Sequence, residues 1–378
     1  MKPNYLSLAF LLATPFTFAN ESEPETDAAS VSEQQNIDTN TEDSSLWGRK
    51  FAILPAPVTD DALGNGLSLT AMYIHDRAAG TENPSISFAY GQYTDTQSGM
   101  LVLGHEHIFS HDEWRAGIYG GHFELNLNHY GSIGFVLPKP IKYTNGSSFT
   151  YGTVKKQIVE DLYVGVHGVW SGGSAKVAND PSLSPEMKNE FEQRMSGSSS
   201  TAAGFLMTYD TRDKMMGATE GVKLDVSTMH YEDRNSGKPY HRIDADFSQF
   251  FPVADNNVFA YRLITEHLIG NVPDYEMVAP ELRGVDWNKA RGQSVYQAEV
   301  EYRHQITEKW SGVAFAGAAY VHSKKSSVQP KGASEIIPST GVGIRYMLDP
   351  TERFSVGADV AVSKDGHTSY YIRFGEAF

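Results

Sequence analysis

The chain ends with Ser369-Tyr370-Tyr371-Ile372-Arg373-Phe374-Gly375-Glu376-Ala377-Phe378, in which apolar and polar side chains alternate. Successive residues of an extended strand point to opposite faces, so such a segment has one apolar and one polar face. The apolar face would carry Tyr370, Ile372, Phe374 and Phe378, and the polar face Ser369, Arg373 and Gly375. This pattern is typical of a strand with lipid on one side and water on the other. It predicts an all-β membrane protein.

The same alternation recurs between residues 47 and 378, in segments of about ten residues separated by turn residues. In the segment 353–364, for example, Val356 and Val360 oppose Ser355 and Asp359. We predict a transmembrane antiparallel β-barrel of about 16 strands, an even number as single-chain bacterial barrels require. The strands are expected near 49–57, 64–76, 84–94, 98–109, 113–125, 146–157, 161–172, 200–210, 219–231, 239–251, 256–270, 293–305, 309–322, 336–348, 352–364 and 367–378.

The connections between these strands differ in length in an ordered way. Long connections fall near 126–145, 173–199, 271–292 and 323–335, whereas those at 252–256, 305–309 and 348–352 are tight. Outer-membrane barrels carry long loops outside and short turns on the periplasmic side. A soluble all-β domain is the alternative, but it would not explain this asymmetry or the terminal Phe.

The amino-terminal segment predicts export. Residues 1–19 have a positive start, an apolar run and a small-x-small ending, as a secretory signal peptide does; a short buried helix is the alternative. Residues 20–46 hold eight acidic residues and no Lys or Arg, so we expect a disordered acidic periplasmic linker, or else an interaction tail. Residues 47–378 would form the barrel, located in the outer membrane of a Gram-negative cell.

Composition agrees with this class. There is no Cys, hydrophobic residues make up only 40%, and the formal net charge is −15. An exported chain without disulfides needs a core or a closed hydrogen-bond network, and a polar lumen would lower mean hydropathy. Nothing in the sequence suggests nucleic-acid binding.

Four segments in order resemble the bacterial surface-antigen superfamily of BamA/TamA-like outer-membrane barrels. They are Ile53-Leu54-Pro55-Ala56-Pro57 with Leu63-Gly64-Asn65-Gly66-Leu67, Tyr209-Asp210-Thr211-Arg212-Asp213 with Gly217 and Gly221, Leu282-Arg283-Gly284 with Arg291-Gly292, and the ending from Gly343 to Phe378. The apolar residues Tyr370, Ile372, Phe374 and Phe378 resemble the sorting signal of such barrels. The chain looks like a short member without the periplasmic POTRA domains.

The resemblance implies that the sixth external loop folds into the lumen as a plug. Arg283 and Gly284 match the loop motif, but Val285 replaces an aromatic, and Gly317 stands where the family has an acidic partner. An ionised Arg in a partly dry lumen needs a partner, so we expect Glu299, Glu301 or Asp359 to take this role. An ordinary solvated Arg is the alternative.

Two further motifs have structural interpretations. Asp210, Arg212 and Asp213 predict a periplasmic turn held by an Asp–Arg pair and by bonds from side chains to the backbone. Pro55 and Pro57 both lack an amide hydrogen on one edge of the first strand, so together with Gly375 they predict a labile seam with the last strand. Prolines that merely end a short strand are the alternative.

The resemblance implies insertion or translocation of proteins or lipids without covalent chemistry. The expected partners are outer-membrane lipid, the barrel-assembly machinery for the chain's own insertion, and unfolded protein or lipid cargo. A passive pore or structural barrel is the alternative, and an outer-membrane lipid-modifying enzyme is the third. His105 and His107 could bind a metal, but interfacial or lumen histidines are commoner, and no catalytic motif occurs. We expect no cofactor.

Overall fold

The computed structural model describes residues 51–378 except 61, 77, 80–84, 130–139, 179, 182, 196–199, 215–216, 234–236, 254–255, 274–275, 289, 324–332, 351–352, 365 and 367. The expected signal peptide and acidic linker lie outside these residues. The structure contains 16 strands: β1 Phe51–Asp60, β2 Gly64–Ile74, β3 Ile86–Thr94, β4 Gly99–Ile108, β5 Trp114–His129, β6 Ile141–Val159, β7 Leu162–Val177, β8 Ser200–Asp210, β9 Gly221–Asp233, β10 Pro239–Val253, β11 Asn257–Gly270, β12 Ser294–Gln305, β13 Trp310–Ser323, β14 Ala333–Asp349, β15 Phe354–Ser363 and β16 Thr368–Phe374.

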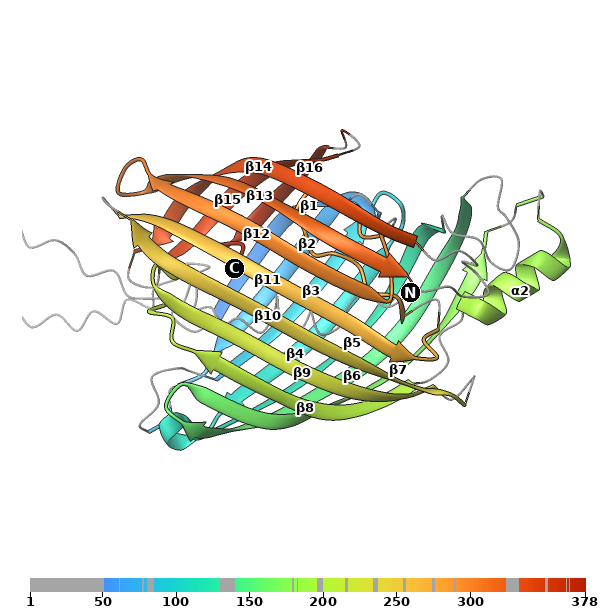
Figure 1. Cartoon of the computed structure of the whole chain (residues 1–378), viewed down its shortest axis with the longest axis horizontal. Coiled ribbons are helices and arrows are strands. Elements are labelled where there is room, and N and C mark those ends of the chain that lie inside the picture. The colour runs from blue at the N-terminus through green and yellow to red at the C-terminus, as the bar shows by residue number, and fades with distance from the viewer. Residues whose placement is uncertain are drawn as a thin grey trace, which may run out of the picture.

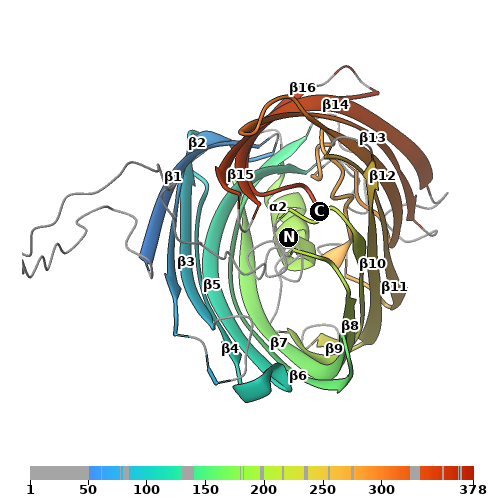
Figure 2. The same cartoon turned by 90° about the vertical axis from the view of Figure 1, so that its left-hand side faces the viewer.

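Each strand pairs antiparallel with the next, and the tilted strands curl into a nearly closed barrel (Figures 1 and 2). β16 comes round to lie beside β1. Among the residues described, no ladder of backbone pairing joins these two strands, whereas every other neighbouring pair has one. The predicted all-β barrel of about 16 strands is therefore confirmed.

Side chains alternate between the outer wall and the lumen as the sequence predicts. On β12, Val300 is 43% exposed on the outside, while Glu299 and Glu301 are 3% and 0% exposed inside. On β14, Val342 and Ile344 face outward and Arg345 is buried inside. A shift of one residue would turn these charges toward lipid, at about 2–4 kcal/mol per Arg or Lys at the midplane, so the register is strongly fixed.

The inner wall in the first half of the barrel is less polar than expected, although buried polar residues such as Asn145 and His167 also lie there. Inward-facing residues of β3 to β9, with residues of the loops and of later strands, form one apolar cluster, which includes Phe88, Val102, Tyr119, Phe123 and Phe149. Val102 is the residue that interrupts the alternation in the segment Leu101-Val102-Leu103, and its side chain packs into this cluster. The lumen here is filled by protein, so its wall can be apolar.

Part of this filling comes from α2, residues Pro185–Met195, which lies at the end of the barrel that carries the long connections (Figure 1). Phe191 of α2 is fully buried, with ring centroids 5.2 Å from Tyr143 and 5.5 Å from His129. The helix begins after Ser184, whose hydroxyl accepts the Met187 N–H at 3.2 Å, as an N-cap does. Among the described residues, no helix is long and apolar enough to cross a bilayer.

The end of the chain also differs from the expected strand. β16 stops at Phe374, and Gly375 has φ +73°, a conformation that glycine adopts without steric penalty. The last residues turn into the barrel, where the terminus is seen inside the ring of strands (Figure 2). Phe378 packs against Phe250 with ring centroids 6.3 Å apart. It therefore does not share the outer face with Tyr370, which is 56% exposed. The side chains of Ile372 and Phe374 lie outside those described.

Candidate functional site: a loop in the lumen that contacts the first and last strands

The connection between β11 and β12, residues 271–293, folds back into the barrel; we call it the plug loop. Its two halves are held together by the pair Val278–Gly292, which exchanges two backbone hydrogen bonds of 2.9 Å. Arg291 adds a hydrogen bond of 2.9 Å to the Met277 carbonyl. This hydrogen-bonded base lets the tip of the loop pack as a defined structure against the inner faces of β12, β13 and β15.

Arg283, at the tip, is surrounded by three carboxylates. Its Nε donates to Glu299 at 2.6 Å, its Nη2 to Glu301 at 2.7 Å and its Nη1 to Asp359 at 3.1 Å. Its guanidinium also lies 3.4 Å from the centre of the Phe315 ring, within the range of a cation–π contact. The structure thus brings together Arg283 and all three partners that the sequence suggested. It adds Phe315, which lies two residues before Gly317 on β13.

The surrounding wall balances the charge of this group. Arg303 donates to Glu301 at 2.8 Å, and Arg345 and Arg373 donate to Asp359 at 2.5 and 3.0 Å. Glu376, just after β16, accepts from Arg345 at 3.1 Å. Four arginines therefore share four carboxylates in a buried network. Such a network is stable only when every charge is paired, which ties the position of the loop to that of the wall.

Two glycines allow the loop to approach the wall this closely. Gly284 has φ +86°, and a Cβ there would lie 2.9 Å from Ser339 Oγ and 3.0 Å from Ala361 Cβ. A Cβ at Gly317 would lie 2.6 Å from Leu282 Cδ1. The missing acidic residue at 317 is therefore replaced by space for Leu282, while Glu299 and Glu301 of the neighbouring strand supply the carboxylates.

The plug loop contacts both strands of the seam. The Gly284 N–H donates to the Tyr371 hydroxyl of β16 at 2.8 Å. The Trp287 indole N–H donates to the Asp60 carboxylate of β1 at 3.2 Å. Sequence reasoning missed Trp287, Asp60 and Tyr371, because only the closed ring of strands brings residues so distant in the chain to one place. The loop thus joins two strands that have no backbone ladder between them in the described residues.

The seam residues lie as follows. Pro55 and Pro57 are inside β1, opposite Leu69 and Leu67 of β2, with their side chains exposed on the outer wall. Gly375 donates its N–H at 2.7 Å to the carbonyl of Ser355. Ser355 belongs to β15, the strand on the side of β16 away from β1. β16 itself ends at Phe374. The lability of this seam remains a prediction.

The turn motif lies at the opposite end of the barrel from α2. Arg212 Nη2 contacts Asp210 at 2.7 Å, and Asp213 accepts the Thr219 N–H and hydroxyl at 2.9 and 2.7 Å. Asp213 also pairs with Arg353, in the turn between β14 and β15. Burial raises the pKa of the Asp213 carboxyl, but the hydrogen bonds from Thr219 and the contact with Arg353 outweigh this effect and hold its pKa below the ordinary value. This connection thus reaches across to a turn more than 100 residues away.

His105 and His107 lie on the outer wall of β4, where their Nδ1 atoms contact Ser87 at 2.8 Å and Ser85 at 3.4 Å. Among the residues that the structure describes, no group of three or more His, Asp or Glu could hold a metal ion. The structure therefore gives these histidines serine partners.

Together, the barrel, its internal loop and its incomplete seam define an outer-membrane β-barrel class, and comparison with known proteins gives the family. The Omp85 superfamily domain matches residues 142–376. The chain therefore belongs to the Omp85 superfamily, which confirms the resemblance to BamA/TamA-like barrels. The fold and family place it in the outer membrane of a Gram-negative bacterium.

Solved structures agree in fold. BamA from Haemophilus ducreyi lacking POTRA domains 1–3 has a TM-score of 0.55 at 12% identity, covering 86% of this chain and 70% of that one. CdiB from Acinetobacter baumannii has a TM-score of 0.53 at 11% identity, and CdiB from Escherichia coli 0.55 at 10%, each covering 86% of this chain. The chain spans only 59% and 62% of those two CdiB structures. A search of curated proteins found no match.

Proposed function

We propose that this barrel inserts or translocates polypeptide or lipid in the outer membrane by opening between β1 and β16, with the plug loop controlling the opening. The observation that carries the proposal is the pair of contacts Trp287–Asp60 and Gly284–Tyr371, one on each side of the seam. Elsewhere in the described residues a continuous ladder of backbone bonds holds neighbouring strands together, whereas here two hydrogen bonds from one loop do so, one from a backbone N–H and one from a side chain. Moving the loop would therefore release both strands at once.

The internal filling supports this proposal over a passive pore. Leu282 and Val285 of the plug loop and Phe191 of α2 belong to the same apolar cluster as the wall of β3 to β9. A water-filled channel is expected to have a polar lining. Planar-bilayer recording distinguishes the two functions, because a pore would give a large steady conductance and a plugged barrel a small one.

Engineered crosslinks test the opening directly. The chain has no Cys, so cysteine pairs can be introduced without a background. One set would join residues 53–57 of β1 to residues 369–371 of β16. The matched control would join Val360 to Tyr370, which face each other across the intact β15–β16 ladder on the same outer wall.

The readout is the insertion of a denatured eight-stranded outer-membrane barrel into liposomes that contain the crosslinked protein, followed by its heat-dependent gel mobility. We expect seam crosslinks to abolish insertion until a reductant is added, and the control crosslink to leave it unchanged. Full insertion with an oxidised seam would refute opening between β1 and β16.

A further inference from the structure

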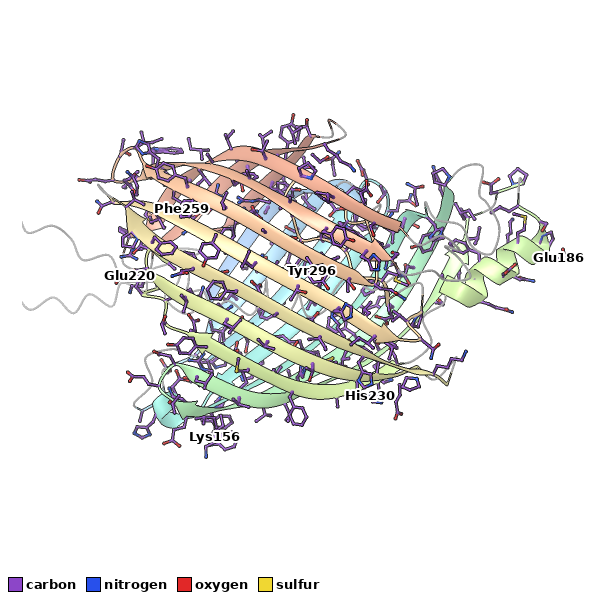
Figure 3. All side chains as sticks on the ribbon, viewed as in Figure 1. Lys156, Glu186, Glu220, His230, Phe259 and Tyr296 are labelled. Carbon is purple, nitrogen blue, oxygen red and sulfur yellow. The ribbon has the colours of Figure 1, made fainter. Side chains whose placement is uncertain are left out.

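The outer wall of β10 to β14 contains a hollow of about 550 Å³ that the plug loop and the seam do not use. Its floor is formed by small outward-facing side chains on neighbouring strands, namely Ala245, Thr265, Ala298 and Ala318. Larger side chains border it, among them Phe247, Leu263, Tyr296 and Tyr320. Tyr296 is seen on the outer wall of β12 in Figure 3. The hollow faces the lipid, so its occupant must be compatible with hydrocarbon.

The strand register places a polar row directly beside this hollow. On each of four strands, the outward-facing residue that follows the hollow toward the long-connection end of the barrel is polar. These residues are His267 on β11, Ser294 on β12, His322 on β13 and Ser334 on β14. The ladders pair these four residues in sequence, each opposite the next. His267 Nδ1 lies 2.5 Å from Ser294 Oγ, and His322 Nδ1 lies 2.8 Å from Ser334 Oγ. The row is thus two His–Ser pairs side by side.

These pairs orient the imidazoles. Because each Nδ1 contacts a serine hydroxyl, each Nε2 is left for another partner. Among the described residues, neither Nε2 has a hydrogen-bond partner. A polar atom that faces lipid without a partner is unfavourable, so the surroundings must supply a hydrogen-bond partner. The row lies within a few residues of the ends of β11 and β13 at the long-loop end, which is the level of the external head groups.

We propose that this wall binds one phosphorylated, multiply acylated lipid of the external leaflet, which in a Gram-negative outer membrane is lipid A. One acyl chain would fill the hollow, and a phosphate would accept hydrogen bonds from the Nε2–H groups of His267 and His322. Hydrocarbon already surrounds the barrel, so the hollow gains little from the hydrophobic effect and selects by shape and dispersion contact. The charge-assisted hydrogen bonds to the phosphate supply the preference for this head group.

Native mass spectrometry of the full chain in a neutral detergent tests the proposal. The probes are purified lipid A, the same lipid A with its phosphates removed, and phosphatidylglycerol. The unmodified protein is expected to retain one lipid A molecule and to retain the other two probes at least tenfold less. The double variant His267→Leu with His322→Leu should bind lipid A at least about tenfold more weakly, because one hydrogen bond to a charged group already accounts for about tenfold and the variant removes two. Ala318→Trp should weaken binding of lipid A by filling the hollow.

Two matched controls keep the result specific. His122→Leu removes an exposed histidine from another strand, where its Nδ1 makes the same kind of contact with Ser148 at 2.9 Å. Ala314→Trp enlarges an exposed alanine on β13 that does not line the hollow. Both should retain lipid A as the unmodified protein does.

Folding of every variant would be verified by heat-dependent gel mobility, and if Ala318→Trp does not fold, the histidine variant carries the test. Equal retention of lipid A by all variants would overturn the proposal, since it would indicate general annular lipid. Equal retention of dephosphorylated lipid A would overturn the phosphate assignment. Equal retention of phosphatidylglycerol, which also carries a phosphate, would overturn the assignment of a multiply acylated lipid. A dimer of this chain that forms without lipid and is lost in Ala318→Trp would show that the wall is a protein interface instead.

Discussion

Trp287 and Asp60 are 227 positions apart in the chain and are joined by a hydrogen bond of 3.2 Å from the indole Nε1 to the carboxylate. The contact fixes the plug loop to the last residue of β1. A second contact, from the Gly284 N–H to the Tyr371 hydroxyl, fixes the same loop to β16. Closure of this barrel therefore depends on hydrogen bonds from an internal loop as well as on the sheet.

Removing either contact should loosen one strand of the seam. Trp287→Phe keeps an aromatic ring but removes the donor to Asp60, and Tyr371→Phe removes the acceptor for Gly284. Each change is expected to cost about 0.5–1.5 kcal/mol, the net value of a typical hydrogen bond. Hydrogen exchange measured by mass spectrometry should become faster in β1 for the first variant and in β16 for the second. The ladder between β6 and β7 is the internal control, and faster exchange there would mean general destabilisation.

Arg283→Ala should release the plug loop. The substitution leaves three buried carboxylates without their shared cation, and breaking a buried pair typically costs about 3–5 kcal/mol. We expect a lower free energy of unfolding in urea and a larger, noisier conductance in planar bilayers. Adding Glu299→Gln to this variant removes one unpaired carboxylate and should recover part of the stability. If Arg283→Ala neither destabilises the barrel nor changes its conductance, the loop does not act as a plug.

Gly284→Ala separates backbone strain from the close approach of the loop to the wall. Gly366 has a similar positive φ of +75°, but a Cβ at this residue would have nothing within 4 Å, so Gly366→Ala is the matched control. Both variants should lose about 1–2 kcal/mol because alanine is strained in the left-handed region. Gly284→Ala should lose more, since its Cβ would collide with Ser339 and Ala361. Equal losses in urea unfolding would argue against tight docking at residue 284.

The turn that contains Asp213 should be sensitive to acid. The folded-state pKa of Asp213 is lowered, so the stabilisation from this group is present above its ordinary pKa of about 4 and is lost as the pH falls through the folded value. Proteolysis of the 211–220 connection should therefore increase below about pH 4. Asp213→Asn should show high susceptibility already at neutral pH and little further change in acid. An acid-dependent increase of the same size in Asp213→Asn would assign the effect to another group.

The positions of the strands could be predicted closely from the sequence. Alternation such as that of Val300 and Glu301 reports directly which side chain meets lipid and which meets the interior. The sequence also suggested Glu299, Glu301 and Asp359 as partners of Arg283, because acids on the inward face of a barrel have few other places to be paired. The role of Gly317 was less evident, since space for Leu282 leaves no mark in the pattern of polarity.

Other features required the folded molecule. Phe378 fits the apolar alternation of the last strand, yet Gly375 turns the chain inward and the ring packs on Phe250. The apolar wall around Val102 looked like an interruption of the pattern, because a sequence does not show that α2 and the plug loop will fill the lumen. Contacts such as Trp287 with Asp60 follow from closure of the ring.

The amino-acid sequence by itself determined the strands, their faces and their register, because these depend on local alternation and on the free energy of placing each side chain in lipid, protein or water. The tertiary structure alone decided which distant residues meet across the lumen and where the seam is held. Those contacts depend on the curvature of the sheet and on the path of one loop, neither of which is encoded in a local pattern.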